Sequence, residues 1–211
     1  MPVDDHQRLE WSAALRSNLE QITDLHSIVQ DRIDRHEAVE KELSEALELV
    51  ERERTEDDDA LGTLASASQD AVRRARLVGV KMEMAFLEGD VPEDVYRAAL
   101  ASAYPAGSQS VGTTPAQRYE ALKRIETALE NHAGADADGA LRELARDGAK
   151  TLEEANAAAK REQEETQQAG QRLSDARGEF DRAYQASKEI VGGLLRDAQR
   201  LAELHDVFPD M

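Results

Sequence analysis

The sequence predicts an all-α protein: a long antiparallel two-helix coiled-coil hairpin that forms a rod-like stalk, with a small helical head at its distal end. Three observations lead to this prediction. Charged residues make up 33% of the 211 residues and aromatic residues only 4%, a composition typical of long helices. Apolar residues recur every seven positions over two long stretches. Turn signals containing Gly and Pro fall between those stretches.

The first arm of the hairpin is predicted from a heptad pattern that begins near residue 15. One file of positions seven apart is Leu15, Ile22, Val29, His36, Leu43 and Val50; the second is Leu19, His26, Ile33, Glu40 and Leu47. The same register continues through the charged stretch 51–59 to Met82 and Ala85. We therefore expect one helix from about Asp5 to Glu88, with 51–59 as the place where it would bend, ended by Gly89 and Pro92.

The head is predicted between the two arms. A short helix should span about 92–103, and a loop rich in Gly, Ser and Thr should follow at 104–114. Thr114 is then placed to cap a helix over about 115–132. This gives three parts: a first stalk helix at 5–76, the head at 77–150 and a second stalk helix at 151–208.

The second arm is predicted as one helix from about Ala140 to Val207, and its heptad pattern can be registered against the first. If facing residue numbers sum to 216, the predicted layers are Leu15 with Leu201, Ile22 with Leu194, Leu43 with Leu173 and Leu64 with Leu152. This register also sets Arg54 opposite Glu162. An opposite-charge pair within an apolar seam can fix the register, so we predict that Arg54 and Glu162 form a buried polar pair.

A second apolar stripe lies beside these seams, in the half of the stalk that carries both termini. Its members taken as a candidate interface are Trp11, Leu25, Ile28, Val39, Tyr184, Val191 and Leu195. A two-helix hairpin cannot cover this stripe, so further helices must do so. The prediction is a homodimer through the base of the stalk; the alternative is a fold-back of the first helix near Asp57 that covers the stripe within one chain.

The charge balance limits the partners that the chain can bind. The formal net charge is −18, which disfavours nucleic acid and anionic lipid because their phosphates are repelled. Arg outnumbers Lys by 20 to 6, and with many carboxylates this usage favours a salt-rich cytoplasm over an ordinary acidic coiled coil. The chain has no cysteine, no signal-peptide pattern and no apolar run long enough to span a membrane, so a cytoplasmic protein is expected.

Residues whose side chains could take part in catalysis or bind a metal do not form a recognisable pattern. The loop Gly107–Thr114 has the glycine spacing of a phosphate-binding loop but lacks its Lys and a preceding strand, which favours a connector. His26 and His36 lie on the seam without a Glu three residues before them, so half-buried seam residues are expected. The run Asp57–Asp59 points in different directions on a helix and is interpreted as solvated.

The favoured function is therefore non-enzymatic: a structural or scaffolding protein that joins or spaces protein partners, with the head as the recognition end and no cofactor. A membrane-remodelling or adaptor hairpin, similar in outline to BAR or ESCRT-III-like proteins, is one alternative, but it requires a basic face or an amphipathic N-terminal helix, which Met1–Glu10 does not offer. A helical-bundle metalloprotein is the other, and it requires inward-facing carboxylates and histidines.

Overall fold

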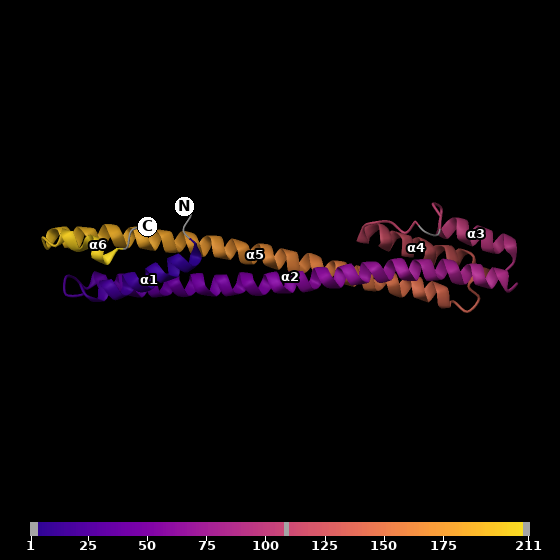
Figure 1. Cartoon of the computed structure of the whole chain (residues 1–211), viewed down its shortest axis with the longest axis horizontal. Helices are drawn as coiled ribbons and strands as arrows, with labels where there is room; N and C mark the ends of the chain where they lie inside the picture. The colour runs from indigo at the N-terminus through magenta and orange to yellow at the C-terminus, as the bar shows by residue number, and fades with distance from the viewer. Residues whose placement is uncertain (1–3, 108–109, 209–211) are drawn as a thin grey trace. The chain divides into compact units, whose positions relative to one another are not determined.

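The chain is all-α in the computed structural model, which describes residues 4–107 and 110–208, and this confirms the predicted fold class (Figure 1). The helices are α1 (Asp5–Glu20), α2 (Ile28–Leu87), α3 (Glu93–Ala103), α4 (Pro115–Asn131), α5 (Ala140–Asp197) and α6 (Leu204–Val207). Short 3-10 turns lie at Ala133–Ala135 and Leu201–Glu203, and no strand occurs among the described residues.

The described residues pack as two compact units. Unit 1 combines the chain up to Thr55 with the chain from Glu165 onward, and unit 2 is Glu56–Glu164. The helices α2 and α5 each give one segment to each unit, whereas α1 and α6 belong to unit 1 and α3 and α4 to unit 2. Unit 2 is larger than the predicted head at 77–150, although α3 and α4 agree with the predicted short helices to within a residue.

The prediction of one uninterrupted helix from Asp5 to Glu88 is wrong. The chain leaves helical structure at Gln21 and re-enters it at Ile28, and α1 folds back along α2 (Figure 1). The connection 21–27 spans one heptad, so the apolar positions on its two sides stay in phase and the pattern does not reveal the reversal. In the turn, the backbone N–H of Ile28 donates to Nδ1 of His26 at 3.0 Å, which caps the start of α2.

The prediction that the last helix continues to Val207 is also wrong. α5 ends at Asp197, and Gln199 adopts a φ of 61°, a left-handed conformation that lets the chain turn back. The short α6 then carries Val207 and Phe208 into the core of unit 1, while Leu201 is 45% exposed. The predicted layer of Leu15 and Leu201 therefore does not form.

The core of unit 1 lies between α1, α2 and α5, with α6 at its edge. α2 and α5 run antiparallel here: Arg35 forms an ion pair with Glu179 at 2.8 Å, and further along α2 the carbonyl of Glu53 accepts a hydrogen bond from Thr166. Leu43 and Leu173 are both buried in this core, as their predicted layer requires. Large side chains fill the space around them, including Leu15, Leu19, Phe180, Tyr184, Leu195 and Phe208.

The core of unit 2 is built from smaller residues. α2 contributes Ala71, Ala75, Val78 and Met82, and α5 contributes Leu141, Ala145, Ala149 and Leu152. From α4, Leu122, Ile125 and Leu129 fill the space between them. The side chains of α2 and α5 in this core are mostly small, and Gly148 of α5 is closely surrounded. A Cβ built there would lie 3.1 Å from Cδ1 of Leu122 and 2.8 Å from Cδ of Arg74.

Candidate interaction surface

The apolar stripe predicted as a dimer interface is covered within unit 1. Val39, Tyr184, Val191 and Leu195 are buried, and Trp11, Leu25 and Ile28 are half-buried. The folded-back α1 and the terminal α6 are the covering elements, and Tyr184 packs edge-on against Phe208 with ring centroids 5.6 Å apart. The physical argument for a homodimer through these residues no longer holds, since no second copy is needed to shield them. The homodimer itself stays a prediction.

The burial of the charged residues around the predicted polar pair, Arg54 and Glu162, differs from the expectation. Arg54 is exposed, and its neighbour Glu53 is the buried residue of this stretch. Glu162 is half-buried and belongs to unit 2, whereas Arg54 belongs to unit 1. The prediction that Arg54 is buried is therefore wrong, and its pairing with Glu162 stays a prediction.

A buried polar cluster surrounds His36 in unit 1. Its Nε2 lies 3.0 Å from Oγ of Ser187, and its backbone carbonyl accepts a hydrogen bond from Ser12; all three residues are fully buried. Burial, together with the positive charges of Arg32, Arg16 and Arg35, lowers the pKa of His36 to about 4. A neutral imidazole in a closed core has no access to a substrate, so this Ser–His contact holds α2 to α5.

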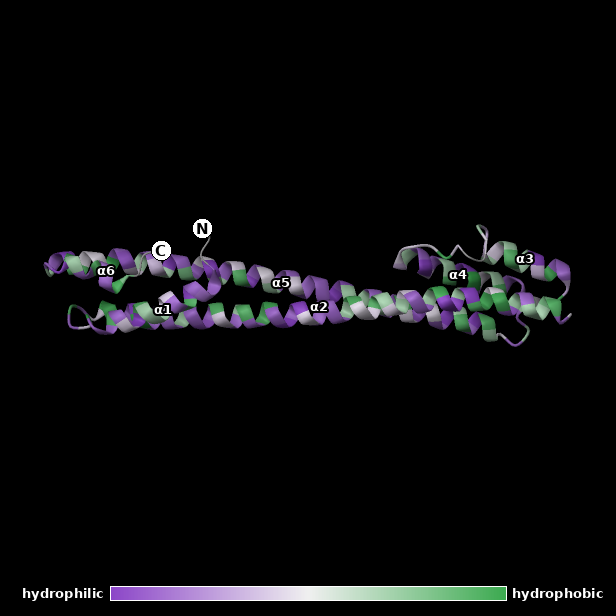
Figure 2. Cartoon of the chain, viewed as in Figure 1, coloured by the Kyte–Doolittle hydropathy of each residue, from purple (hydrophilic) through white to green (hydrophobic). Residues whose placement is uncertain are grey.

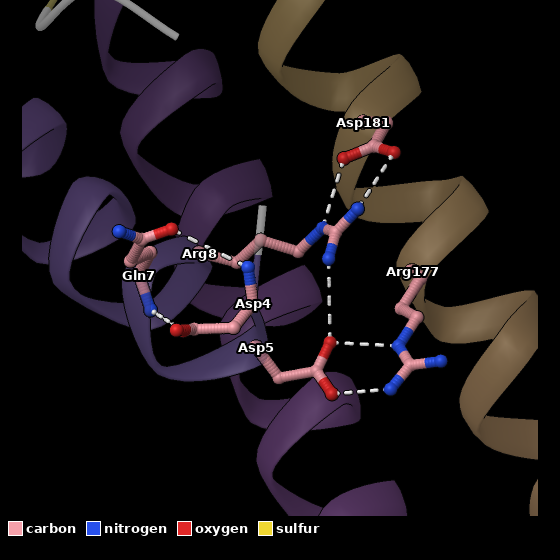
Figure 3. Close-up of polar contacts among 6 residues, drawn as sticks. All are labelled: Asp4, Asp5, Gln7, Arg8, Arg177 and Asp181. Atoms are coloured by element: carbon pink, nitrogen blue, oxygen red, sulfur yellow. Dashed lines mark hydrogen bonds and ion pairs between the residues drawn. The ribbon is translucent and has the colours of Figure 1, made fainter. Parts of the chain in front are cut away.

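A network of ion pairs fixes the start of α1 against α5 (Figure 3). Arg177 forms a bidentate pair with the carboxylate of Asp5, and Arg8 bonds Asp181 through Nε at 3.1 Å. The hydrogen bond from Arg177 holds the pKa of Asp5 below its usual value. In the adjoining capping box, the carboxylate of Asp4 accepts a hydrogen bond from the backbone N–H of Gln7. The side-chain Oε1 of Gln7 accepts one from the backbone N–H of Asp4. These ion pairs hold the folded-back α1 against α5.

In the loop that has the glycine spacing of a phosphate-binding loop, polar groups at its end form hydrogen bonds with the first turn of α4. Oε1 of Gln117 accepts the backbone N–H groups of Thr113 and Thr114, and the hydroxyl of Thr114 accepts the N–H of Gln117. Ser108 and Gln109 of this loop lie outside the described residues. The described residues at the end of the loop therefore act as the cap of α4, in agreement with the interpretation of the loop as a connector.

The strongest candidate for a functional surface is an apolar stripe on α2 in unit 2. Of the six large apolar side chains that are exposed in the described part of the chain, five lie on this segment of α2. Four of them follow one helical face, with spacings of three, four and three residues: Leu77, Val80, Met84 and Leu87, which we call the α2 stripe. Figure 2 shows hydrophobic residues recurring along this part of α2.

The α2 stripe faces away from the core of its own unit. The opposite face of the same turns carries Ala75, Val78 and Met82, which are buried. α3 approaches at another side, where Tyr96 stacks on Phe86 with ring centroids 4.6 Å apart. α2 is therefore apolar on two faces between residues 75 and 87, and only one of the two is covered. Solvent-exposed apolar patches of this kind mark interaction sites.

Charged residues of opposite sign flank the two ends of the α2 stripe. Arg73 and Arg76 lie at its N-terminal end, and Glu88 and Asp90 lie at its C-terminal end; all four are exposed. The C-terminal end is fixed by Gly89, whose φ of 84° allows the backbone N–H of Asp90 to donate to the carbonyl of Ala85 and close the helix. The stripe is thus a helical surface with positive charge at its N-terminal end and negative charge at its C-terminal end.

The α2 stripe was not among the predicted candidate surfaces, although its pattern is present in the sequence. Positions 77, 80, 84 and 87 follow a second 3–4 repeat, on the helical face opposite the seam positions 75, 78 and 82. The predicted placement of a recognition end within 77–150 nevertheless includes this surface.

Comparison of the chain with protein-family models, with curated proteins and with solved structures gives no match. Among the described helices, none combines the length and the apolar character needed to cross a lipid bilayer.

Proposed function

We propose that this protein is a non-enzymatic helical scaffold that binds protein partners, and that the α2 stripe of unit 2 is its recognition surface. The observation that carries the proposal is the uneven cover of α2. The apolar faces of unit 1 are shielded by α1 and α6, whereas Leu77, Val80, Met84 and Leu87 of unit 2 are between 41% and 74% exposed. Keeping four such residues in water is unfavourable, and a bound partner would relieve that cost.

The stripe has the form that helical partners recognise. Apolar anchors at intervals of three and four residues fit a second helix packed along the first, as in coiled-coil contacts. The flanking charges add specificity, since a partner must present the opposite order of charges along its length.

The test compares two aspartate substitutions on the same helix. Leu77 lies in the stripe and is 41% exposed; Leu61 lies outside it, in the same unit, and is 49% exposed. The immobilised chain, Leu77→Asp and Leu61→Asp are exposed to extract of the native host at high KCl, and the retained proteins are quantified. A recognition role predicts proteins that are retained by the wild type and by Leu61→Asp but lost with Leu77→Asp. The same retained set for all three chains would contradict the proposal.

We also propose that the net charge of −18 reflects a salt-rich cellular interior. Repulsion among 44 acidic residues, only partly offset by 26 basic ones, is screened over about 3 Å at 1 M salt and over about 10 Å at 0.1 M. The melting temperature should therefore rise steeply with KCl, by about 2–4 °C for each kcal/mol of repulsion removed. A melting temperature that stays constant between 0.1 M and 2 M KCl would contradict this part of the proposal.

A further inference from the structure

The α2 stripe has the spacing of one strand of a two-helix coiled coil. Leu77 and Met84 occupy equivalent positions seven apart, and Val80 and Leu87 occupy the second set, offset by three. In coiled coils these two sets are the seam positions. In an antiparallel pair, a member of one set faces a member of the other. Pairing the stripe with a copy of itself in this way places Leu77 opposite Leu87 and Val80 opposite Met84, with a twofold axis that crosses the stripe midway between Val80 and Met84.

The charges flanking the stripe distinguish this arrangement from a parallel one. Antiparallel pairing brings the Arg73 and Arg76 end of one copy to the Glu88 and Asp90 end of the other, twice by symmetry. Parallel pairing would bring like charges together at both ends. The arginines would also lie near the C-terminal end of the other α2, where the helix dipole favours positive charge. The apolar residues of the stripe and the charges at its two ends are thus self-complementary in one orientation only.

We infer that the partner of the α2 stripe is a second copy of this chain, packed antiparallel along residues 73–90 of α2. This inference rests on the proposed function, because it names the partner of the same surface. The contact is short and falls at the small end of specific interfaces, so weak association is expected. Because each copy carries a net charge of −18, association should require high salt.

The first experiment is sedimentation velocity of the full chain in 2 M KCl at protein concentrations up to about 0.5 mM, because a small interface associates weakly. The wild type should show a monomer–dimer equilibrium. Leu77→Asp and Leu87→Asp should each weaken it at least ten-fold, because each substitution acts twice in the symmetric contact. Leu61→Asp is the matched control and should dimerise like the wild type. Circular dichroism checks that every variant keeps its helicity.

The second experiment determines orientation and uses the absence of cysteine from the chain. Leu77→Cys and Leu87→Cys chains are mixed and oxidised. Antiparallel packing predicts the mixed disulfide between residues 77 and 87, in excess over either self-disulfide. A charge test is independent of this: Arg76→Asp should weaken dimerisation, and Arg76→Asp combined with Asp90→Arg should restore it.

Several results would overturn the inference. These are a wild type that stays monomeric at 0.5 mM in high salt, equal loss of dimer in Leu61→Asp, or excess self-disulfides. Flotation with anionic lipid vesicles that is lost in Leu77→Asp would assign the stripe to a membrane and overturn both proposals. A monomeric wild type that still retains host proteins through Leu77 would overturn self-pairing alone and leave the proposed function standing.

Discussion

Units 1 and 2 use segments of the same two helices but close their surfaces differently. In unit 1 both ends of the chain turn back, and α1 and α6 cover the apolar faces of α2 and α5 over a core of large side chains such as Phe180 and Tyr184. In unit 2 the insertion of α3 and α4 covers one face of α2, and the α2 stripe on another face stays exposed. An apolar helical face therefore predicts that something packs there, but the connections decide whether the chain itself supplies the cover.

The largest expected difference between the units comes from removing a central aromatic ring. Phe180 is fully buried beside His36, and Phe180→Ala should destabilise unit 1 by about 3–5 kcal/mol. Hydrogen exchange should then become faster in α1 and in the α5 segment of unit 1, with little change in α3 and α4. Met82→Ala, at a fully buried position of unit 2, should give the reverse pattern. Equal acceleration in both units for either variant would show that they unfold as one.

Low pH should destabilise unit 1 more than unit 2, because His36 lies in unit 1. The folded state favours neutral His36, because its pKa is lowered from 6.5 to about 4. The resulting stabilisation is complete above about pH 6.5 and is lost as the pH falls toward 4, an effect of about 3 kcal/mol. Unit 1 should therefore open before unit 2 between pH 6.5 and 4, as seen by hydrogen exchange. His36→Leu should flatten this dependence, and His132→Leu, in unit 2, should leave it unchanged. A pH profile of unit 1 that is the same in all three chains would contradict the role given to His36.

Two glycines of α5 provide a matched test of packing density. A Cβ at Gly148 in unit 2 meets Leu122 and Arg74, whereas a Cβ at Gly170 in unit 1 meets nothing within 4 Å. Gly148→Ala should destabilise unit 2 by about 1 kcal/mol, because crowding exceeds the gain in helix propensity. Gly170→Ala should stabilise unit 1 by about 0.5–1 kcal/mol. Urea unfolding of the two variants measures both changes. Stabilisation by both substitutions would show that α5 can move away from α4.

The smallest expected effect concerns the ion pairs that close α1 onto α5. Asp5→Asn removes the charge paired with Arg177 and should cost about 1 kcal/mol, since Arg177 is partly exposed to solvent. Because the pKa of Asp5 is lowered in the folded state, its contribution is present above about pH 4 and is lost as the pH falls further. Exchange of α1 amides at neutral pH should increase in Asp5→Asn and not in Glu10→Gln, which changes an exposed acid of the same helix. Identical exchange in the two variants would contradict the role given to the ion pair of Asp5 and Arg177.

Much of the local structure could be predicted from the sequence. The heptad files identified buried positions such as Val29, Leu43 and Leu173, and the Gly and Pro signals located α3, α4 and the end of α2. Two features were not predictable from the repeat. The reversal at 21–27 leaves the heptad phase unchanged, and the end of α5 lacks a proline or a helix-ending glycine at Gln199. The positions of buried residues were therefore better predicted than the elements that cover them.

The sequence by itself determined the helical class, the seam residues of α2 and α5 and the acidic surface, because periodicity, turn chemistry and charge are local properties of the chain. Only the tertiary structure decided which apolar stripe stays exposed. Val39 and Val80 both lie off the seam of α2, yet α1 folds over the part of unit 1 that holds Val39, and no described segment covers Val80. Burial depends on which distant segments return to a given helical face, and the pattern of that face alone does not contain this information.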